Sequence, residues 1–307
     1  MPNEDLPIQY DSRSSAWNDP QQIIIATVVP EPPYEAATKP LMRRRWKLPL
    51  ALFVATCLST LLIGGWVYAA CLMTILVCHE MGHFLQARKY GVYASYPFFL
   101  PMPMPPFGTF GAVIAMDSRI RDRKALFDIG ISGPLAGLVP TLLCCILGIM
   151  FDASLDVARP AEFHFGEPLL FKWLAYMKFG AIPEGYEIYL GPVAMAGWVG
   201  LLITALNLIP IGQLDGGHVL YALIRRRAHV VASALLYLAL GSVIVGFLVA
   251  KPSNFSLMAL LLVVMGPKHP PTSDDYVPLG RTRVVLGWLT LAFLLLGFTP
   301  NPLEVGP

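Results

Sequence analysis

The sequence predicts an all-α polytopic membrane protein, with about six to seven transmembrane helices and a membrane-embedded β-hairpin or re-entrant loop after the second helix. Of its 307 residues, 55% are hydrophobic and only 14% are charged, whereas ordinary soluble domains carry about 25% charged residues. Several apolar runs approach the roughly 20 residues that cross a bilayer as a helix. Helices also satisfy their backbone polar groups internally, which the bilayer core requires.

The first apolar stretch, 48–77, is about 30 residues long and therefore exceeds a single span. Glycine adopts the backbone angles of tight turns without a steric penalty. We therefore expect Gly64-Gly65 to separate a helix at about 48–64 from a second helix at about 67–87. The basic residues and the glycine of "ARKYG" are typical of a helix C-terminus.

The next apolar stretch, 93–116, contains five prolines. Prolines at this density break an ordinary spanning helix, and "GTFGAVIAM" at its end is more typical of extended structure. Non-helical backbone at membrane depth has to be buried in protein or line a wet cavity. The stretch is therefore interpreted as a hairpin or re-entrant loop beside the polar end of the second helix.

The remaining apolar runs predict further helices, some of them broken by polar segments. A polar segment, 152–187, contains a candidate short amphipathic helix, "EPLLFKWLAYMKFG". The further spanning helices are expected at about 128–151, 188–209, 229–250, 255–266 and 284–299.

Positive charge is distributed unevenly along the chain. The net charge is only +2, which gives no case for nucleic-acid binding. With a cytoplasmic N-terminus, the predicted inside segments hold 18 of the 22 Lys and Arg residues, as the positive-inside rule requires. Residues 1–45 lack the features of a signal or transit peptide and are interpreted as a disordered cytoplasmic tail. These features favour a bacterial cytoplasmic membrane.

The second helix carries an H-E-x-x-H motif, formed by His79, Glu80 and His83. Residues four apart lie on one face of a helix, so the two histidines can hold one metal ion. Glu80 can then reach a metal-bound water as general base. Zinc lowers the pKa of such a water to about 7. The bare pattern also occurs by chance, but three polar groups at the end of an apolar helix favour a metal site.

A catalytic zinc site needs a third protein ligand and one open position. Carboxylates within apolar helices are rare and usually functional, and three candidates lie near this depth: Asp117, Asp128 and Asp215. The first two bracket a basic segment at the expected interface. Asp215 follows a long apolar helix and precedes two glycines, which favours it as the ligand.

Two other polar residues lie close to Asp215 in the sequence. His218 follows it by three residues and is either an additional ligand or an ordinary interfacial histidine. Asn207 is an amide at the end of an apolar helix. It either makes a hydrogen bond between packed helices or orients substrate and stabilises a developing oxyanion.

These motifs resemble those of the site-2 protease family of intramembrane zinc metalloproteases. "HEMGH" (79–83) is similar to its H-E-x-G-H, and "NLIPIGQLDGGH" (207–218) to its N-x-x-P-x-x-x-L-D-G element. "GTFGAVI" (108–114) and "DIGISGPLAG" (128–137) resemble its membrane-embedded hairpin and the Gly-rich helix that follows. The resemblance covers about 45–300. The order and spacing of the motifs resemble the compact branch of bacteria and plastids.

The resemblance implies one zinc ion per chain, held by His79, His83 and Asp215. It also implies Glu80 as the base, Asn207 near the substrate, and pairing of 108–114 with an unwound substrate segment by strand addition. The implied activity is that of a zinc-dependent intramembrane endopeptidase. It would cleave in or near a transmembrane segment of a membrane-protein substrate, by Glu80-assisted attack of a zinc-bound water. The segment before the fourth predicted helix is too short for a PDZ domain.

The predicted organisation is a cytoplasmic tail, 1–45, an intramembrane metalloprotease domain, 46–300, and a short C-terminal tail, 301–307. The expected partners are a transmembrane protein substrate and the lipid bilayer. Two other functions fit the sequence less well. A non-catalytic membrane scaffold has no need of a general base such as Glu80. A metal transporter would carry polar residues along several helices, which most of the predicted helices lack.

Overall fold

The computed structural model describes residues 46–117, 120–157, 163–248, 263, 266, 272–299 and 303–305. The predicted tail 1–45 lies outside this part of the chain, and so does nearly all of the predicted helix at 255–266. The described residues belong to one unit, Arg44–Pro307.

The described chain is mainly helical, with three small two-stranded sheets. The helices are α1 (Lys47–Lys89), α2 (Arg123–Leu147), α3 (Leu169–Phe179), α4 (Pro192–Asn207), α5 (Asp215–Ile224), α6 (Arg227–Leu248) and α8 (Arg281–Gly297). The strands are β1 (Phe98–Pro101), β2 (Thr109–Val113), β3 (Ala153–Val157), β4 (Phe163–Phe165), β5 (Tyr186–Leu190) and β6 (Leu303–Val305). A π-helical turn, Gly148–Asp152, continues α2.

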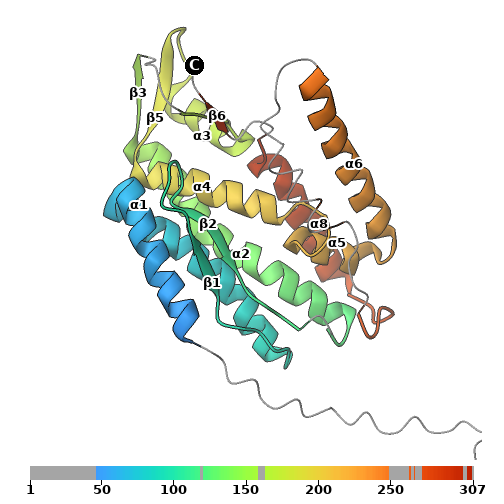
Figure 1. Cartoon of the computed structure of the whole chain (residues 1–307). Coiled ribbons are helices and arrows are strands. Elements are labelled where there is room, and N and C mark those ends of the chain that lie inside the picture. Colours follow the sequence, from blue (N-terminus) through green and yellow to red (C-terminus); the bar gives the residue numbers. More distant parts are fainter. Residues whose placement is uncertain are drawn as a thin grey trace, which may run out of the picture. The chain divides into compact units, whose positions relative to one another are not determined.

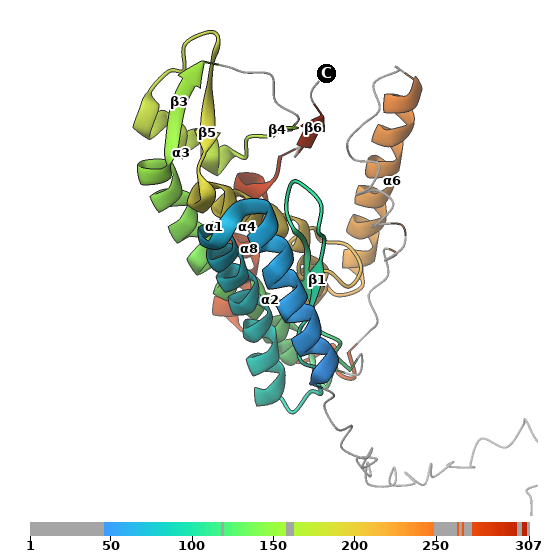
Figure 2. The same ribbon diagram turned by 60° about the vertical axis from the view of Figure 1, so that its left-hand side comes forward.

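Helix α1 reverses its direction at Gly65, as Figures 1 and 2 show. The backbone there has φ 77° and ψ −179°, which glycine adopts more readily than other residues. A side chain on the preceding Gly64 would collide with the ring of Tyr68, since its Cβ would lie 2.2 Å from that ring. The predicted turn at Gly64-Gly65 is therefore confirmed.

Three helical segments in the described part of the chain are long and apolar enough to cross a membrane: Lys47–Lys89, Arg123–Asp152 and Arg227–Val245. Large apolar side chains cover their outer faces, including Leu62, Phe151 and Leu238, which are 79%, 83% and 71% exposed. Such exposure suits contact with lipid rather than water. The predicted count of six to seven transmembrane helices is not confirmed, although α4 is a shorter apolar helix.

Helix α2 lies at the centre of the helical packing and contacts α1, α4, α5 and α8. It begins five residues earlier than predicted, because the Asp122 carboxylate caps it by accepting a hydrogen bond from the Ala125 amide at 2.9 Å. Close approach to α1 depends on Gly82, whose added Cβ would lie 2.4 Å from the carbonyl oxygen of Ser132.

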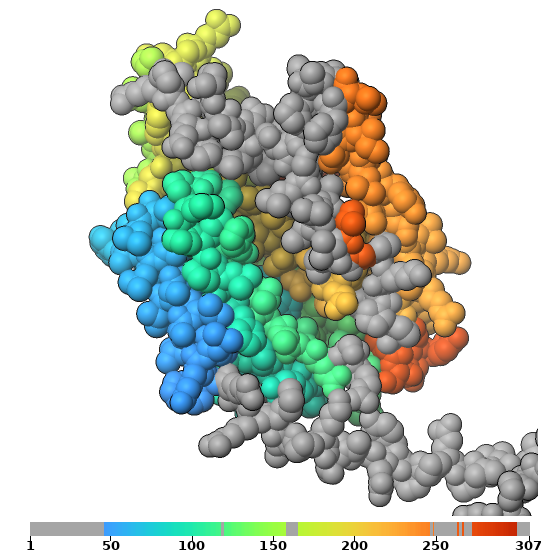
Figure 3. Space-filling model, in the orientation of Figure 1, coloured from blue at the N-terminus to red at the C-terminus, as the bar shows by residue number. Residues whose placement is uncertain are grey.

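The proline-rich stretch after α1 forms an antiparallel hairpin of β1 and β2, with Phe98 opposite Val113 and Pro101 opposite Thr109. Helix α1 holds its tip: Ser59 Oγ donates to the Gly108 carbonyl at 2.6 Å, and Tyr68 Oη donates to the Phe107 carbonyl at 2.7 Å. In Figure 3 the hairpin, in teal, lies at the surface beside the first half of α1, in blue. The predicted extended structure is confirmed, and its embedding in the membrane stays a prediction.

Three parts of the fold differ from the expected helices. The helix expected at 188–209 begins only at Pro192, because β5 occupies 186–190 and Gly191 and proline start the helix. The predicted amphipathic helix is confirmed as α3 and buries Phe171 and Leu174. The sheets β3–β5 and β4–β6 were not predicted.

Helix α5 was not expected either. It is only ten residues long and starts with "DGG", and glycine disfavours helix. Packing overrides this tendency, because Val219, Leu220 and Tyr221 are buried against Leu126 and Phe127 of α2.

Candidate metal centre

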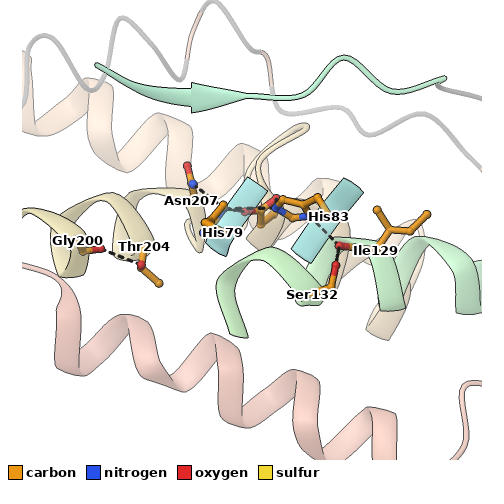
Figure 4. Close-up of polar contacts among 8 residues, drawn as sticks. His79, His83, Ile129, Ser132, Gly200, Thr204 and Asn207 are labelled. Atoms are coloured by element: carbon orange, nitrogen blue, oxygen red, sulfur yellow. Dashed lines mark hydrogen bonds and ion pairs between the residues drawn. The ribbon is translucent and has the colours of Figure 1, made fainter. Parts of the chain in front are cut away.

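His79 and His83 lie one turn apart in the second half of α1, and their side chains point the same way (Figure 4). Their Nε2 atoms are 3.3 Å apart, and the residues are only 4% and 5% exposed. Helix α2 leaves room for both rings. A Cβ on Gly133 would lie 2.0 Å from Nε2 of His83, and one on Gly137 would lie 2.9 Å from Cβ of His79.

Asp215 is the first residue of α5 and reaches the two histidines from a distant part of the sequence. Its Oδ2 lies 3.1 Å from Nε2 of His79, and its Oδ1 lies 3.2 Å from Nε2 of His83. The two glycines that follow allow the start of α5 to pack closely against the backbone of the preceding loop. A Cβ on Gly216 would lie 2.0 Å from the carbonyl oxygen of Leu208. Glycine therefore allows the tight approach that positions this carboxylate.

The three side chains fit the requirements of a zinc ion. One ligand atom from each lies within 4.8 Å of the others, and in the described part of the chain they form the one such cluster. Nδ1 of His83 lies 2.8 Å from the carbonyl oxygen of Ile129. A carbonyl can only accept, so Nδ1 donates and Nε2 keeps its lone pair for a metal. Two imidazoles and one carboxylate make a typical catalytic zinc set with an open position.

Glu80 and Asn207 lie beside this group. Glu80 follows His79 on α1, is 4% exposed, and lines the same cavity as the three candidate ligands. Asn207 is the last residue of α4, and its Nδ2 atom lies 3.2 Å from Nε2 of His79 (Figure 4). A carboxylate and an amide are therefore within reach of anything bound at the cluster.

The cavity at this cluster has a volume of about 230 Å³. Strand β2 and the chain after it form the wall across from the helices. Its lining residues are His79, Glu80, His83, Ala112, Val113, Ile114, Met116, Asp117, Ile120, Asn207, Gln213, Leu214, Asp215 and His218. A polypeptide segment in this cavity would therefore lie between the metal cluster and a strand.

The other ligand candidates have different surroundings. Asp128 accepts two hydrogen bonds from Arg283, each at 2.8 Å, and one from Tyr90 at 2.5 Å. It therefore ties α1, α2 and α8 together instead of facing the cluster. Asp117 and His218 line the cavity but lie outside the ligand cluster.

The groups that orient His83 were not predicted from the sequence. The Ile129 carbonyl accepts from the ring and also from Ser132 Oγ at 2.8 Å. A backbone carbonyl leaves no signature in residue type. The spacing of Gly133 and Gly137, four and eight residues after Ile129 and hence on the same helix face, is a signal that marks this face of α2. The cavity residue Gln213 was also missed.

Comparison with known proteins identifies the family. The model of Peptidase family M50 matches residues 67–250, which include all three candidate ligands. The chain belongs to peptidase family M50. The resemblance to the site-2 proteases is therefore confirmed, and the match supports the predicted enzyme class, a site-2-type metalloendopeptidase.

The curated relatives of this M50 chain carry zinc metalloprotease names. "Probable zinc metalloprotease EGY2, chloroplastic" of Oryza sativa subsp. indica is 30% identical over 251 residues, covering 80% of this chain and 45% of the relative. "Probable zinc metalloprotease EGY1, chloroplastic" of Arabidopsis thaliana is 29% identical over 231 residues, covering 74% and 41%. The chain thus spans less than half the length of these relatives. Their chloroplastic names do not test the predicted bacterial membrane.

Gly133 offers a direct test of the M50 cluster's geometry. Replacing Gly133 with alanine places a methyl group against the His83 ring, and displacing the ring would strain its hydrogen bond to the Ile129 carbonyl. We expect zinc affinity to fall by about 10- to 100-fold, the range typical for groups that orient a ligand. Competition of the purified protein with a zinc chelator measures this affinity.

Gly241→Ala is the matched control, because Gly241 also lies in a helix and an added Cβ would meet no atom within 4 Å. It should leave zinc affinity unchanged. Equal affinity in the Gly133→Ala protein would show that His83 is not held in the described position.

Proposed function

We propose that this chain is a zinc-dependent intramembrane endopeptidase, which hydrolyses a peptide bond in or near a transmembrane segment of a membrane protein. One observation carries the proposal. His79, Glu80 and His83 are buried on a helix apolar enough to span a membrane, and Asp215 of α5 completes a His-His-Asp cluster beside this glutamate. Polar groups are costly at such a depth and usually mark function. Membership of family M50 supports the same reaction class.

In this proposal, His79, His83 and Asp215 hold one zinc ion per chain. When bound, zinc supplies a Lewis acid that acidifies water and polarises the scissile carbonyl. Glu80 takes the proton from the attacking water and delivers it to the nitrogen of the departing amine. The Asn207 amide donates a hydrogen bond to the oxygen of the carbonyl under attack.

The hairpin provides a way to present the substrate. A peptide bond within a helix is shielded by side chains, so the substrate has to be extended before attack. Strand β2 pairs with β1 on one side, and in the described part of the chain no second strand pairs with its other side. Ala112 and Val113 of β2 line the cluster's cavity. A substrate segment that added to β2 would therefore lie against the cluster.

The membrane setting follows from charge and hydropathy. Placing the N-terminus and the metal cluster toward the cytoplasm leaves 18 of 22 Lys and Arg on that side. We propose that the chain works in a bacterial cytoplasmic membrane and releases its product into the cytoplasm.

Removal of the metal tests the proposal. The full-length protein is purified in detergent, its metal content is measured, and it is reconstituted with a membrane-anchored model substrate. We expect about one zinc per chain, loss of cleavage after treatment with 1,10-phenanthroline, and recovery when zinc is returned.

In a control, the same chelator is saturated with zinc before it is added. It then cannot remove the protein's metal, so any loss of cleavage would come from inhibition by the chelator itself. A folded protein that carries no metal would contradict the proposal and favour the scaffold.

A further inference from the structure

A second cavity, of about 580 Å³, lies away from the metal cluster at the junction of α5 and α6. Four of the five charged residues that line it are arginines. Its lining residues are Arg123, Leu223, Ile224, Arg225, Arg226, Arg227, Asp275 and Tyr276. Four guanidinium groups thus share one cavity with a single carboxylate.

The one carboxylate in this wall is already engaged. Asp275 accepts hydrogen bonds from Tyr221 Oη at 2.7 Å and from Thr272 Oγ1 at 2.6 Å. Burial raises the pKa of Asp275, but these hydrogen bonds outweigh it and leave the pKa below its usual value. The carboxylate is therefore ionised. In the part of the chain that the structure describes, none of the four arginines forms an ion pair, so the cavity keeps an excess of positive charge.

Arg123 shows that the positive charge of this second cavity is part of the fold. It is 8% exposed, and its guanidinium donates to the carbonyl of Ala222 and, at 3.0 Å, to that of Leu223, at the end of α5. Two of its five N–H donors are used in this way. The positive-inside rule accounts for arginines on this side of the membrane, but it does not require one of them to be buried in a cavity.

Arg225 is held in place at an energetic cost. Its φ of 56° is the only positive value among the described non-glycine residues, and such strain is often found at functional sites. Its guanidinium lies 5.2 Å from the centre of the Tyr276 ring, which orients a planar cation. Arg226 and Arg227 follow with exposed side chains.

The cavity also lies at the expected level of the membrane surface. Two of the candidate spans, Arg123–Asp152 and Arg227–Val245, begin with arginines that line it. Arginine binds phosphate oxygens in pairs of parallel hydrogen bonds, and basic pockets between spans on the cytoplasmic side bind anionic headgroups. We propose that this cavity binds a phosphate group, supplied by the headgroup of an anionic phospholipid.

This cavity is separate from the metal cluster. Helix α5 begins at Asp215 and ends at Ile224, so the two sites lie at opposite ends of a ten-residue helix, roughly 15 Å long. Phosphate binding therefore does not depend on the proposed peptidase activity. Glu80→Gln should leave it unchanged, which distinguishes failure of this proposal from failure of the proposed function.

Native mass spectrometry of the full-length protein tests the proposal. The purified protein is titrated with phosphatidylglycerol, phosphatidylcholine or glycerol 3-phosphate. We expect one bound phosphatidylglycerol per chain in preference to phosphatidylcholine. The Arg226→Gln/Arg227→Gln variant should bind it about 10- to 30-fold more weakly, since each arginine near a membrane surface contributes roughly a three- to fivefold factor.

The matched control is Arg88→Gln/Arg281→Gln, which removes two exposed arginines outside the cavity. It should bind phosphatidylglycerol like the wild type. Binding of glycerol 3-phosphate as tight as that of the lipid would support the phosphate site and assign it a water-soluble ligand. Equal binding in both double variants, or no preference for the anionic lipid, would overturn the proposal.

Discussion

Replacing Glu80 with glutamine is expected to abolish cleavage of a membrane-anchored substrate while the protein keeps about one zinc per chain. Glutamine has the same shape but cannot take a proton from water. Loss of a general base lowers rates by about 10²- to 10⁴-fold. Glu80 is 4% exposed and is not part of the ligand cluster, so the metal should remain. Cleavage rate and zinc content are measured on the same preparation.

Glu167→Gln is the matched control, because Glu167 is an exposed glutamate outside the cavity whose carboxylate pairs with Lys172 at 3.7 Å. Such exposed pairs contribute little, and the variant should cleave at the wild-type rate. Cleavage by Glu80→Gln at a rate near that of the wild type would assign the base to another residue. Loss of zinc together with activity would show that Glu80 supports the metal rather than the proton transfer.

The local part of the site could be read from the sequence, because helical spacing fixes it. His79 and His83 face one way on any helix, and Gly65 marks the reversal of α1 through a backbone angle that favours glycine. The partners across the fold could not be read in this way. The Ile129 carbonyl that orients His83 has no residue-type signal, and the pairing of β3 with β5 joins segments about 30 residues apart.

The choice among the three carboxylates shows the same limit. Spacing alone left Asp117 and Asp128 open beside Asp215. The packing sets Asp128 apart from Asp215, because Asp128 accepts hydrogen bonds from Arg283 and Tyr90 where three helices meet. Helix α5, which carries Asp215, forms through tertiary burial against a weak local tendency. The sequence could therefore favour Asp215 only through the apolar helix before it, the two glycines after it and the family resemblance.

Replacing Asp215 with alanine is expected to remove zinc from the purified protein. Asp215 reaches both histidines, at 3.1 and 3.2 Å, and no second carboxylate belongs to the cluster in the described residues. Two histidines on one helix do not make a closed set of protein ligands. Affinity should fall by more than the roughly 10- to 100-fold typical of residues that only orient a ligand. Zinc per chain is measured by inductively coupled plasma mass spectrometry after dialysis.

Asp117→Ala is the control that discriminates most sharply, because Asp117 lines the same cavity and was a rival ligand. It should keep about one zinc per chain. A second variant, Asp215→Asn, preserves the side-chain shape and guards against a folding defect in Asp215→Ala. Both Asp215 variants should unfold at the same temperature as the zinc-free wild type. Zinc kept by Asp215→Ala but lost by Asp117→Ala would move the third ligand to the other wall of the cavity. The ligand would then come from the chain that follows β2, and the cavity could not hold substrate and metal on opposite sides as proposed.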